Sequence, residues 1–122
     1  MAKTILTVDD APTMRRLIAF ALAGAGHKVL EAPDGQAALE MLKTTAVDLV
    51  ITDVNMPNMN GIELTRNLRR LSAHARTPVL IVTTESELGV KTAGKQAGAT
   101  GWIVKPFEAP QLLAVVKRVL GE

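Results

Sequence analysis

Apolar residues follow two alternating spacings along the chain. Short apolar runs with the length and composition of buried strands lie at 4–8, 28–32, 48–52, 78–83 and 101–104. Between the runs, apolar residues recur every three or four positions, which predicts amphipathic helices. The helix-forming sets are Met14, Leu17, Ile18, Ala21 and Leu22, then the segment 34–43, then Leu64, Leu68 and Leu71, and finally Leu112, Val115, Val116, Val119 and Leu120.

Three helix boundaries can be predicted from single residues. Pro12 suits the first turn of a helix, and Gly24 or Gly26 suits its exit. Asp34 is expected to cap the second helix, because a carboxylate there can accept from the free N–H groups of the first turn.

The segment 85–98 is the exception to the strong pattern. Its apolar stripe is thin, and Gly89 and Gly94 each cost a helix interior about 1 kcal/mol relative to alanine. We expect a marginal helix here, and marginal elements tend to be the ones that move.

Strands that alternate with helices predict βαβ units and a parallel sheet, with helices on both faces because the strands are strongly apolar. Five units favour an α/β, flavodoxin-like fold: a three-layer (βα)5 sandwich with strand order 2-1-3-4-5. A chain of 122 residues has the size of one domain, so we expect a single domain over 1–122.

Composition narrows the function classes. The absence of cysteine excludes disulfides and thiolate metal sites. No apolar run approaches the roughly 20 residues of a membrane span, and the N-terminal segment does not resemble a signal peptide. We therefore expect a soluble cytoplasmic protein with no membrane partner.

Charge gives little sign of nucleic-acid binding, because the net charge is +2 and aromatic residues are few. The densest basic stretch is expected to be a solvated helix face; it comprises Arg66, Arg69, Arg70 and Arg76. His27 and His74 are isolated in the sequence, and we expect surface or structural roles for both.

Polar residues follow four of the predicted strands. Asp9 and Asp10 follow the first and Asp53 the third, while Thr83 ends the fourth and Lys105 follows the fifth. In the expected strand order, strands one and three are neighbours, so the three carboxylates would converge at one edge of the sheet.

Such an acidic cluster needs a cation, and a site of oxygen ligands with room for water suits Mg²⁺. Together with the ammonium of Lys105 the charges would sum to zero, and such a site could accept a phosphoryl group on one carboxylate. Taken singly, these residues have ordinary interpretations as a helix cap, a turn residue or a solvated lysine. Their joint placement favours the phosphoryl site.

The motifs "DD" at Asp9, "DVNMPNMNG" at Asp53, "VTTE" at Thr83 and "KPF" at Lys105 resemble the receiver domain of two-component response regulators. The match runs through the whole chain in order and leaves nothing for an output domain. The likeness is greatest to the stand-alone chemotaxis regulators of the CheY type.

The resemblance implies a role for each position. Asp53 would be the phosphoacceptor; Asp10, Asp53 and the backbone carbonyl of Asn55 would bind Mg²⁺ directly, and Asp9 through a bound water. Thr83 would be the switch hydroxyl and Lys105 the charge partner of the phosphoryl group. Asn55 and Glu85 would tune hydrolysis, and the Lys105–Pro106 bond would be cis.

One position departs from the commonest family pattern. The residue three before Lys105 is usually a tyrosine or phenylalanine that turns inward on activation, and here it is Trp102. A tryptophan is bulkier than either, so its inward rotamer would need more room than Thr83 vacates.

The family also implies partners. A sensor histidine kinase of the CheA type would donate the phosphoryl group, and a phosphatase could remove it. The switched surface would comprise helix four, strand five and helix five, with Lys91, Lys95 and Lys117 on or near it. We expect it to bind an acidic or amphipathic segment, such as one from a flagellar motor switch protein. We expect a monomer.

Four other functions fit parts of the sequence. A stand-alone receiver in a phosphorelay unrelated to chemotaxis would look similar. A true aspartate-nucleophile phosphatase typically carries a second aspartate two residues after the nucleophile, where this chain has Asn55. A flavin or nucleotide binder is disfavoured because no P-loop occurs and "GAG" at 24–26 follows a helix rather than a strand. A pseudo-receiver would lack the intact acidic set.

Overall fold

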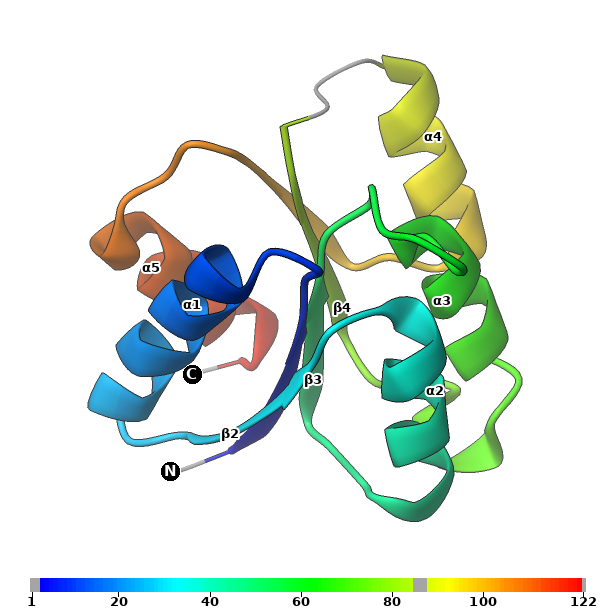
Figure 1. Cartoon of the computed structure of the whole chain (residues 1–122), viewed down its shortest axis with the longest axis horizontal. Coiled ribbons are helices and arrows are strands. Elements are labelled where there is room, and N and C mark those ends of the chain that lie inside the picture. The colour runs from blue at the N-terminus through cyan, green and yellow to red at the C-terminus, as the bar shows by residue number, and fades with distance from the viewer. Residues whose placement is uncertain (1–2, 85–87, 122) are drawn as a thin grey trace.

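The computed structural model describes residues 3–84 and 88–121. It contains one parallel sheet in the order β2-β1-β3-β4-β5 (Figure 1). The strands are β1 (Thr4–Val8), β2 (Lys28–Ala32), β3 (Leu49–Thr52), β4 (Val79–Thr83) and β5 (Gly101–Val104). The predicted fold class and strand order are therefore confirmed.

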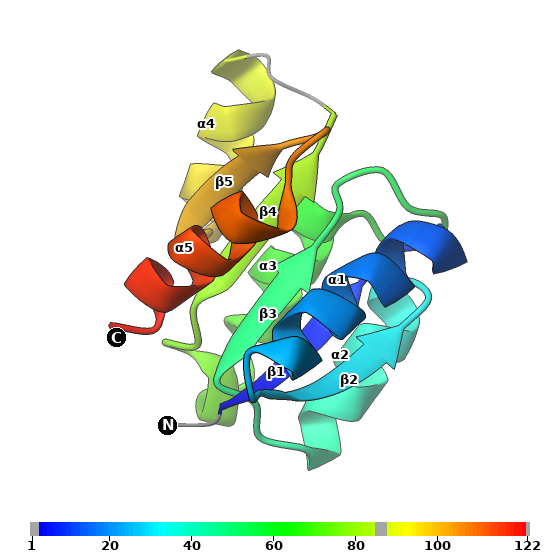
Figure 2. The ribbon, with the colours of Figure 1, turned by 90° about the vertical axis from the view of Figure 1, so that its left-hand side faces the viewer.

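The helices form two outer layers. They are α1 (Pro12–Gly24), α2 (Gly35–Thr44), α3 (Gly61–Leu68), α4 (Leu88–Ala97) and α5 (Ala109–Val119), with a short 3₁₀ turn, η1 (Ser72–His74). Figures 1 and 2 show α1 and α5 side by side on one face of the sheet, and α2, α3 and α4 on the other. None of these helices is long and apolar enough to cross a membrane, within the part of the chain that the structure describes.

Successive strand residues fill two separate cores, because side chains alternate between the faces of a sheet. Ile5, Ile51 and Val82 pack with α1 and α5. Leu6 and Val50 pack with α2 and α3. Both layers are aliphatic, so the strands place their apolar side chains on both faces and leave polar chemistry to the strand ends.

The predicted boundaries hold to within a residue or a turn. Pro12 begins α1, and the Asp34 carboxylate caps α2 by accepting from Ala37 N at 2.8 Å. β4 begins after Pro78, whose carbonyl accepts from Val50 N at 3.0 Å but which has no N–H to donate. The third helix was predicted to reach Leu71 but ends at Leu68, because the chain turns there into η1.

The prediction that the basic stretch is a solvated helix face is wrong for Arg69. Its guanidinium donates to the carbonyls of His74 at 2.9 Å, Thr77 at 2.6 Å and Gly98 at 2.7 Å, and burial lowers its pKa. Arg69 thus ties the end of α3 to the residue after α4. The other three arginines of the stretch, Arg66, Arg70 and Arg76, are exposed as predicted, but only Arg66 lies on a helix.

The two histidines have structural roles, as predicted. His74 is fully buried; its Nδ1 lies 3.0 Å from Thr77 Oγ1, and its Nε2 lies 3.1 Å from Leu42 O. His27 is half-buried, and its Nδ1 accepts from Lys3 N at 3.2 Å. His74 joins the end of α2 to the connection before β4, far from the strand ends that carry the acids.

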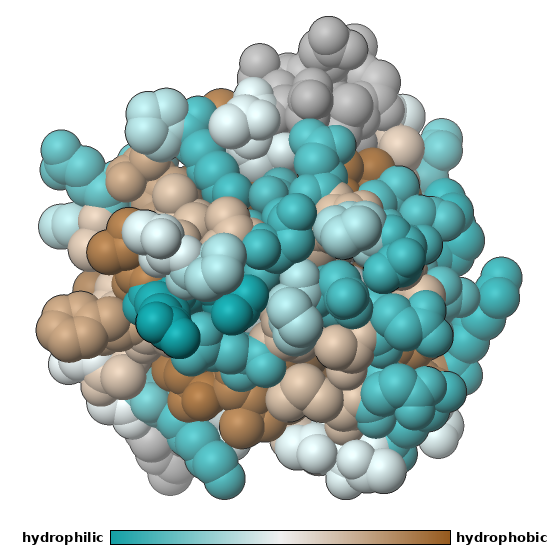
Figure 3. All heavy atoms as spheres, in the orientation of Figure 1, coloured by the Kyte–Doolittle hydropathy of each residue, from teal (hydrophilic) through white to brown (hydrophobic). Residues whose placement is uncertain are grey.

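An apolar hollow of about 380 Å³ lies between α1 and α5. Two large apolar side chains of α1 at its rim are exposed, Leu17 to 60% and Phe20 to 81%. Figure 3 shows hydrophobic surface gathered on the side of the molecule where these two helices lie. Exposed apolar surface of this kind is typical of an interaction site.

Candidate functional site

The register of the sheet brings the acids together. β1 and β3 are hydrogen-bonded neighbours in which Val8 pairs with Thr52, so Asp9 and Asp53 leave the sheet at the same level. Asp53 N donates to Val8 O at 3.0 Å, and Asp9 N donates to Ala32 O at 3.2 Å. The two aspartates are therefore placed by the backbone of three adjacent strands.

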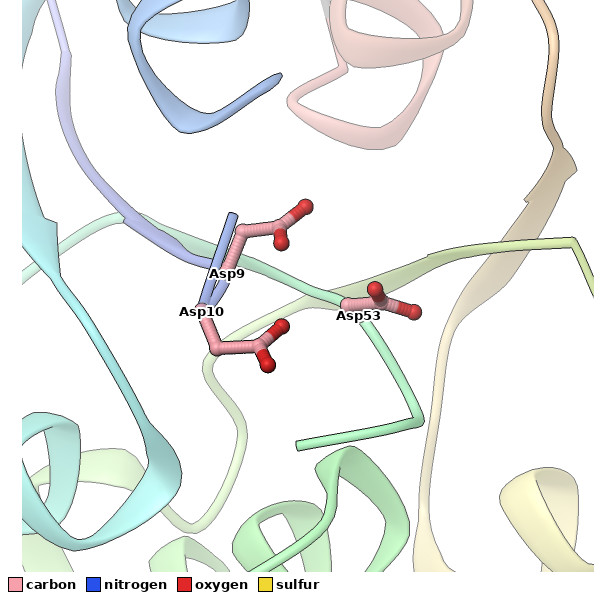
Figure 4. A group of neighbouring side chains, drawn as sticks. All are labelled: Asp9, Asp10 and Asp53. Carbon is pink, nitrogen blue, oxygen red and sulfur yellow. The ribbon is translucent and has the colours of Figure 1, made fainter. Parts of the chain in front are cut away.

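The three carboxylates converge as predicted. Oxygens of Asp9, Asp10 and Asp53 lie within 4.8 Å of one another (Figure 4). Asp9 is only 2% exposed, whereas Asp10 faces solvent. One oxygen of Asp9 accepts from Ala11 N at 2.9 Å, and one of Asp53 accepts from Val54 N at 2.7 Å. These bonds fix the orientation of the Asp9 and Asp53 carboxylates, and Asp10 is the member of the cluster that is open to solvent.

Lys105 is the cation of the cluster. Its Nζ lies 3.1 Å from Asp9 Oδ2 and 3.1 Å from Asp53 Oδ2. Burial alone would lower the pKa of Lys105, but the hydrogen bonds and charges of Asp53 and then Asp9 outweigh it, so the pKa is raised above its usual value. The two carboxylates therefore favour the charged form of the Lys105 ammonium.

A backbone hydrogen bond between β5 and β4 helps to hold Lys105 over the acids. Its N–H donates to Thr83 O at 2.8 Å, which ties the end of β5 to the end of β4. The Lys105–Pro106 bond is cis, as the family resemblance implied.

The donor set fits a hard divalent cation. One ammonium offsets one of the three carboxylates, which leaves a formal charge of about −2 in a small volume. All the ligand atoms are oxygens and Asp10 is open to water, which is the environment that Mg²⁺ prefers.

The loop after Asp53 is held by a glycine that the sequence reading did not single out. A Cβ on Gly61 would collide with the carbonyl of Asp53, which also accepts from Thr52 Oγ1 at 2.9 Å. Gly61 N in turn donates to Val54 O at 3.0 Å. Only a residue without a side chain permits this approach, so Gly61 fixes the main chain of the central aspartate.

The switch residues lie where the strands place them. Thr83 is fully buried at the end of β4. Asn55 is exposed in the loop after Asp53, and Glu85 lies outside the described residues. The catalytic, metal-binding and rate-tuning roles given to these residues therefore stay predictions.

Trp102 points to the α4 side of the sheet and is partly buried. A Cβ on Gly94 would come within 3.0 Å of its Cζ3 atom, so this glycine, unfavourable for α4 itself, makes room for the indole. The indole Nε1 is buried without a hydrogen-bond partner among the described residues. A buried donor left unpaired costs about 1–3 kcal/mol, so this ring position is not fully satisfied.

Arg15 also contacts the site, although nothing in the sequence reading singled it out. Its guanidinium donates to the backbone carbonyl of Asp9 at 2.7 Å and pairs with Glu31 of β2 at 3.1 Å. The signal could have been its place in the first turn of the helix that follows the paired aspartates.

Comparisons with known proteins agree with this geometry. Residues 5–117 match the family described as the response regulator receiver domain. The chain is 45% identical over 109 residues to the chemotaxis protein CheY-3 of Vibrio cholerae. This alignment covers 88% of this chain and 84% of that protein.

Solved structures give the same result. The chain superposes on Vibrio cholerae chemotaxis protein CheY4 with a TM-score of 0.94 at 40% identity, covering 98% of this chain and 99% of that one. It superposes on the receiver domain of the sensor histidine kinase PA1611 of Pseudomonas aeruginosa with a TM-score of 0.91 at 26% identity, covering 100% of both. That structure has a magnesium ion coordinated in its active-site cleft.

Proposed function

This chain belongs to the response regulator receiver domain family, and on that premise we propose that it is a stand-alone response regulator whose Asp53 accepts a phosphoryl group from a histidine kinase. One observation carries the proposal: Lys105 contacts both Asp9 and Asp53 at 3.1 Å, with Asp10 in the same cluster. One acid is enough for a structural ion pair with a lysine. Here Lys105 contacts two acids and a third lies beside them, which leaves negative charge that a cation can neutralise.

These positions support the following route for phosphoryl transfer. A carboxylate oxygen of Asp53 attacks the phosphorus of a phosphohistidine, the new O–P bond forms, and the P–N bond breaks with its electron pair passing to the imidazole nitrogen. The Lys105 ammonium lies 3.1 Å from Asp53, where it can pair with a phosphoryl oxygen.

Asp10, Asp53 and the Asn55 carbonyl would hold Mg²⁺, with Asp9 acting through a water. When bound, Mg²⁺ neutralises the charge on the phosphoryl oxygens. Hydrolysis would return the Asp53 carboxylate and inorganic phosphate, and we expect Asn55 and Glu85 to tune its rate. Asn55 has no acidic proton to give to a leaving group, which disfavours a multiple-turnover phosphatase.

The proposed output is a population shift. A phosphoryl dianion on Asp53 would attract the Thr83 hydroxyl and Lys105, and inward movement of Thr83 would open space beside Trp102. The Nε1 of Trp102 has no hydrogen-bond partner among the described residues, which supports this movement, because a side chain that is not satisfied in one position costs less to move.

The only tryptophan gives a direct test of this switch. Beryllofluoride with Mg²⁺, a stand-in for the phosphoryl group, should change the emission of Trp102. In Thr83→Ala, beryllofluoride should still bind, as ¹⁹F NMR would detect. Most of the change in Trp102 emission should be lost, because the variant lacks the hydroxyl that would hydrogen-bond to the phosphoryl group.

Thr84→Ala is the matched control, since Thr84 is the exposed neighbour of the buried Thr83. It should keep the full response. An unchanged emission response in Thr83→Ala would refute the coupling between the phosphoryl site and Trp102.

We place the output surface on α4, β5 and α5. Lys91 and Lys95 are exposed and border a hollow of about 300 Å³ beside Trp102. Cations beside an apolar ring suit an acidic or amphipathic partner segment, such as one from a flagellar motor switch protein. The similarity to CheY-3 and CheY4 favours chemotaxis over another phosphorelay, with a CheA-like kinase as donor, a phosphatase as a further partner, and a cytoplasmic monomer as the working form.

The electrostatic part of this docking can be measured. With a flagellar motor switch peptide and the beryllofluoride-loaded chain, Lys91→Glu combined with Lys95→Glu should weaken binding about tenfold or more, and wild-type binding should weaken with added salt. Lys28→Glu, an exposed charge reversal on the far edge strand β2, should change little. Equal affinity of the double variant and the wild type would exclude a docking role for these two lysines.

A further inference from the structure

Arg15 joins three parts of the molecule at the edge of the acidic site. It lies on the first turns of α1, and its NH1 donates to the backbone carbonyl of Asp9 at 2.7 Å. Its Nε donates to a carboxylate oxygen of Glu31 on β2 at 3.1 Å. The Arg15 side chain is only 15% exposed, so it is packed in this position rather than sampling solvent.

We propose that Arg15 is a positioning residue: by holding the Asp9 carbonyl it fixes the turn that carries Asp9 and Asp10, and so sets the affinity of the acidic site for Mg²⁺. The proposal rests on the function proposed above, since that function supplies the cation. It concerns how the site is held in shape rather than which atoms bind the metal.

The turn needs such a support. Three carboxylates within 4.8 Å repel one another, and in the absence of a cation this repulsion acts to open the turn after β1. Lys105 restrains Asp9 and Asp53 but makes no ion pair with Asp10. Asp10 is exposed and is placed by the main chain that precedes it, of which the Asp9 carbonyl is a part.

The contacts of Arg15 form a brace across two strands. Asp9 N donates to Ala32 O at 3.2 Å. The carboxylate of Glu31, the residue before Ala32, accepts a hydrogen bond from the Arg15 guanidinium. Asp9 is therefore held to β2 from both its amide and its carbonyl. A guanidinium suits this task because its planar fork can donate to two acceptors at once.

Charge and geometry predict opposite results for the loss of Arg15. A positive charge beside a cation site weakens cation binding, so removing it should tighten Mg²⁺ if charge were its main effect. Arg15 contacts a carbonyl rather than the site carboxylates, and Glu31 offsets its charge. If positioning dominates, removing it should weaken Mg²⁺ instead.

Isothermal titration calorimetry with Mg²⁺ alone decides between the two. We expect Arg15→Met to bind Mg²⁺ about tenfold more weakly than the wild type, the scale found when a residue that orients metal ligands is lost. Arg15→Lys should also bind more weakly, because an ammonium on a flexible stem keeps the charge but not the two-armed brace. Arg16→Met, which removes the exposed arginine next to it on α1, should bind as tightly as the wild type or slightly more tightly.

Urea unfolding checks that each variant is folded at the titration temperature. If Arg15→Met is not folded, Arg15→Lys provides the test instead. Equal or tighter Mg²⁺ binding by the folded Arg15 variant would overturn the proposal. A wild-type chain that binds Mg²⁺ but takes no phosphoryl group on Asp53 would contradict the proposed function, and the order of the affinities would still decide on Arg15. A wild-type chain that binds no Mg²⁺ would overturn both.

Discussion

Asp53→Asn is expected to abolish covalent labelling of the chain by acetyl phosphate in the presence of Mg²⁺. The amide that replaces the carboxylate is not a nucleophile, and in the part of the chain that the structure describes no other carboxylate both follows β3 and contacts Lys105. In the wild type, mass spectrometry should find the added phosphoryl mass on the peptide that contains Asp53. Chelation with EDTA should remove the labelling as well.

Asp34→Asn is the matched control. Asp34 caps α2 from outside the site, and asparagine caps a helix about as well as aspartate. This variant should be labelled at the wild-type rate. A label that persists in Asp53→Asn, or that forms equally well in EDTA, would show that the chemistry does not run through the central aspartate.

Gly61→Ala is expected to lower the free energy of unfolding by about 2–3 kcal/mol, the upper part of the usual cost of forced overpacking, which is about 1–3 kcal/mol. The new methyl group would overlap the carbonyl of Asp53, and since both partners are backbone, neither a rotamer change nor a flexible side chain can relieve the clash. Urea unfolding at neutral pH measures the loss. Because the displaced group is the main chain of the phosphoacceptor, labelling of the folded variant should slow too.

Gly24→Ala makes the same chemical change where the structure has space. Gly24 is the last residue of α1, and nothing lies within 4 Å of a Cβ built on it. The substitution should be neutral or stabilising by up to about 1 kcal/mol, because alanine favours a helix. If both glycine variants unfolded at the wild-type urea concentration, the close approach at Gly61 would not constrain the protein.

The acidic site was predictable because each of its members obeys a local rule. Asp9 and Asp53 each follow an apolar run whose length identifies a strand, and the parallel order then places them side by side. Lys105 follows the last strand by the same logic. For these residues, position along the chain and the topology of the sheet suffice.

The residues that sequence reading missed or misplaced depend on contacts between distant segments. Arg69 reaches Gly98, 29 positions away, so helical spacing alone could not show that its side chain is not solvated. Gly94 weakens α4 by propensity, and only the structure shows that it accommodates Trp102. Arg15 looked like any helix-surface arginine until the Asp9 carbonyl and Glu31 were seen to converge on it.

The close packing of Gly61 on the Asp53 carbonyl makes the two walls of the site unequal. On the β3 side, the aspartate is clamped between Thr52 and Gly61 and has no room to retreat. On the β4 side, the chain continues from Thr83 toward α4. The sequence of α4 favours a helix only weakly, so we expect this helix to deform most easily. A bulky group added to Asp53 would therefore meet a rigid wall on the β3 side and a more deformable one on the β4 side. We therefore expect a signal from Asp53 to pass toward α4, in a direction that the protein itself sets before any partner binds.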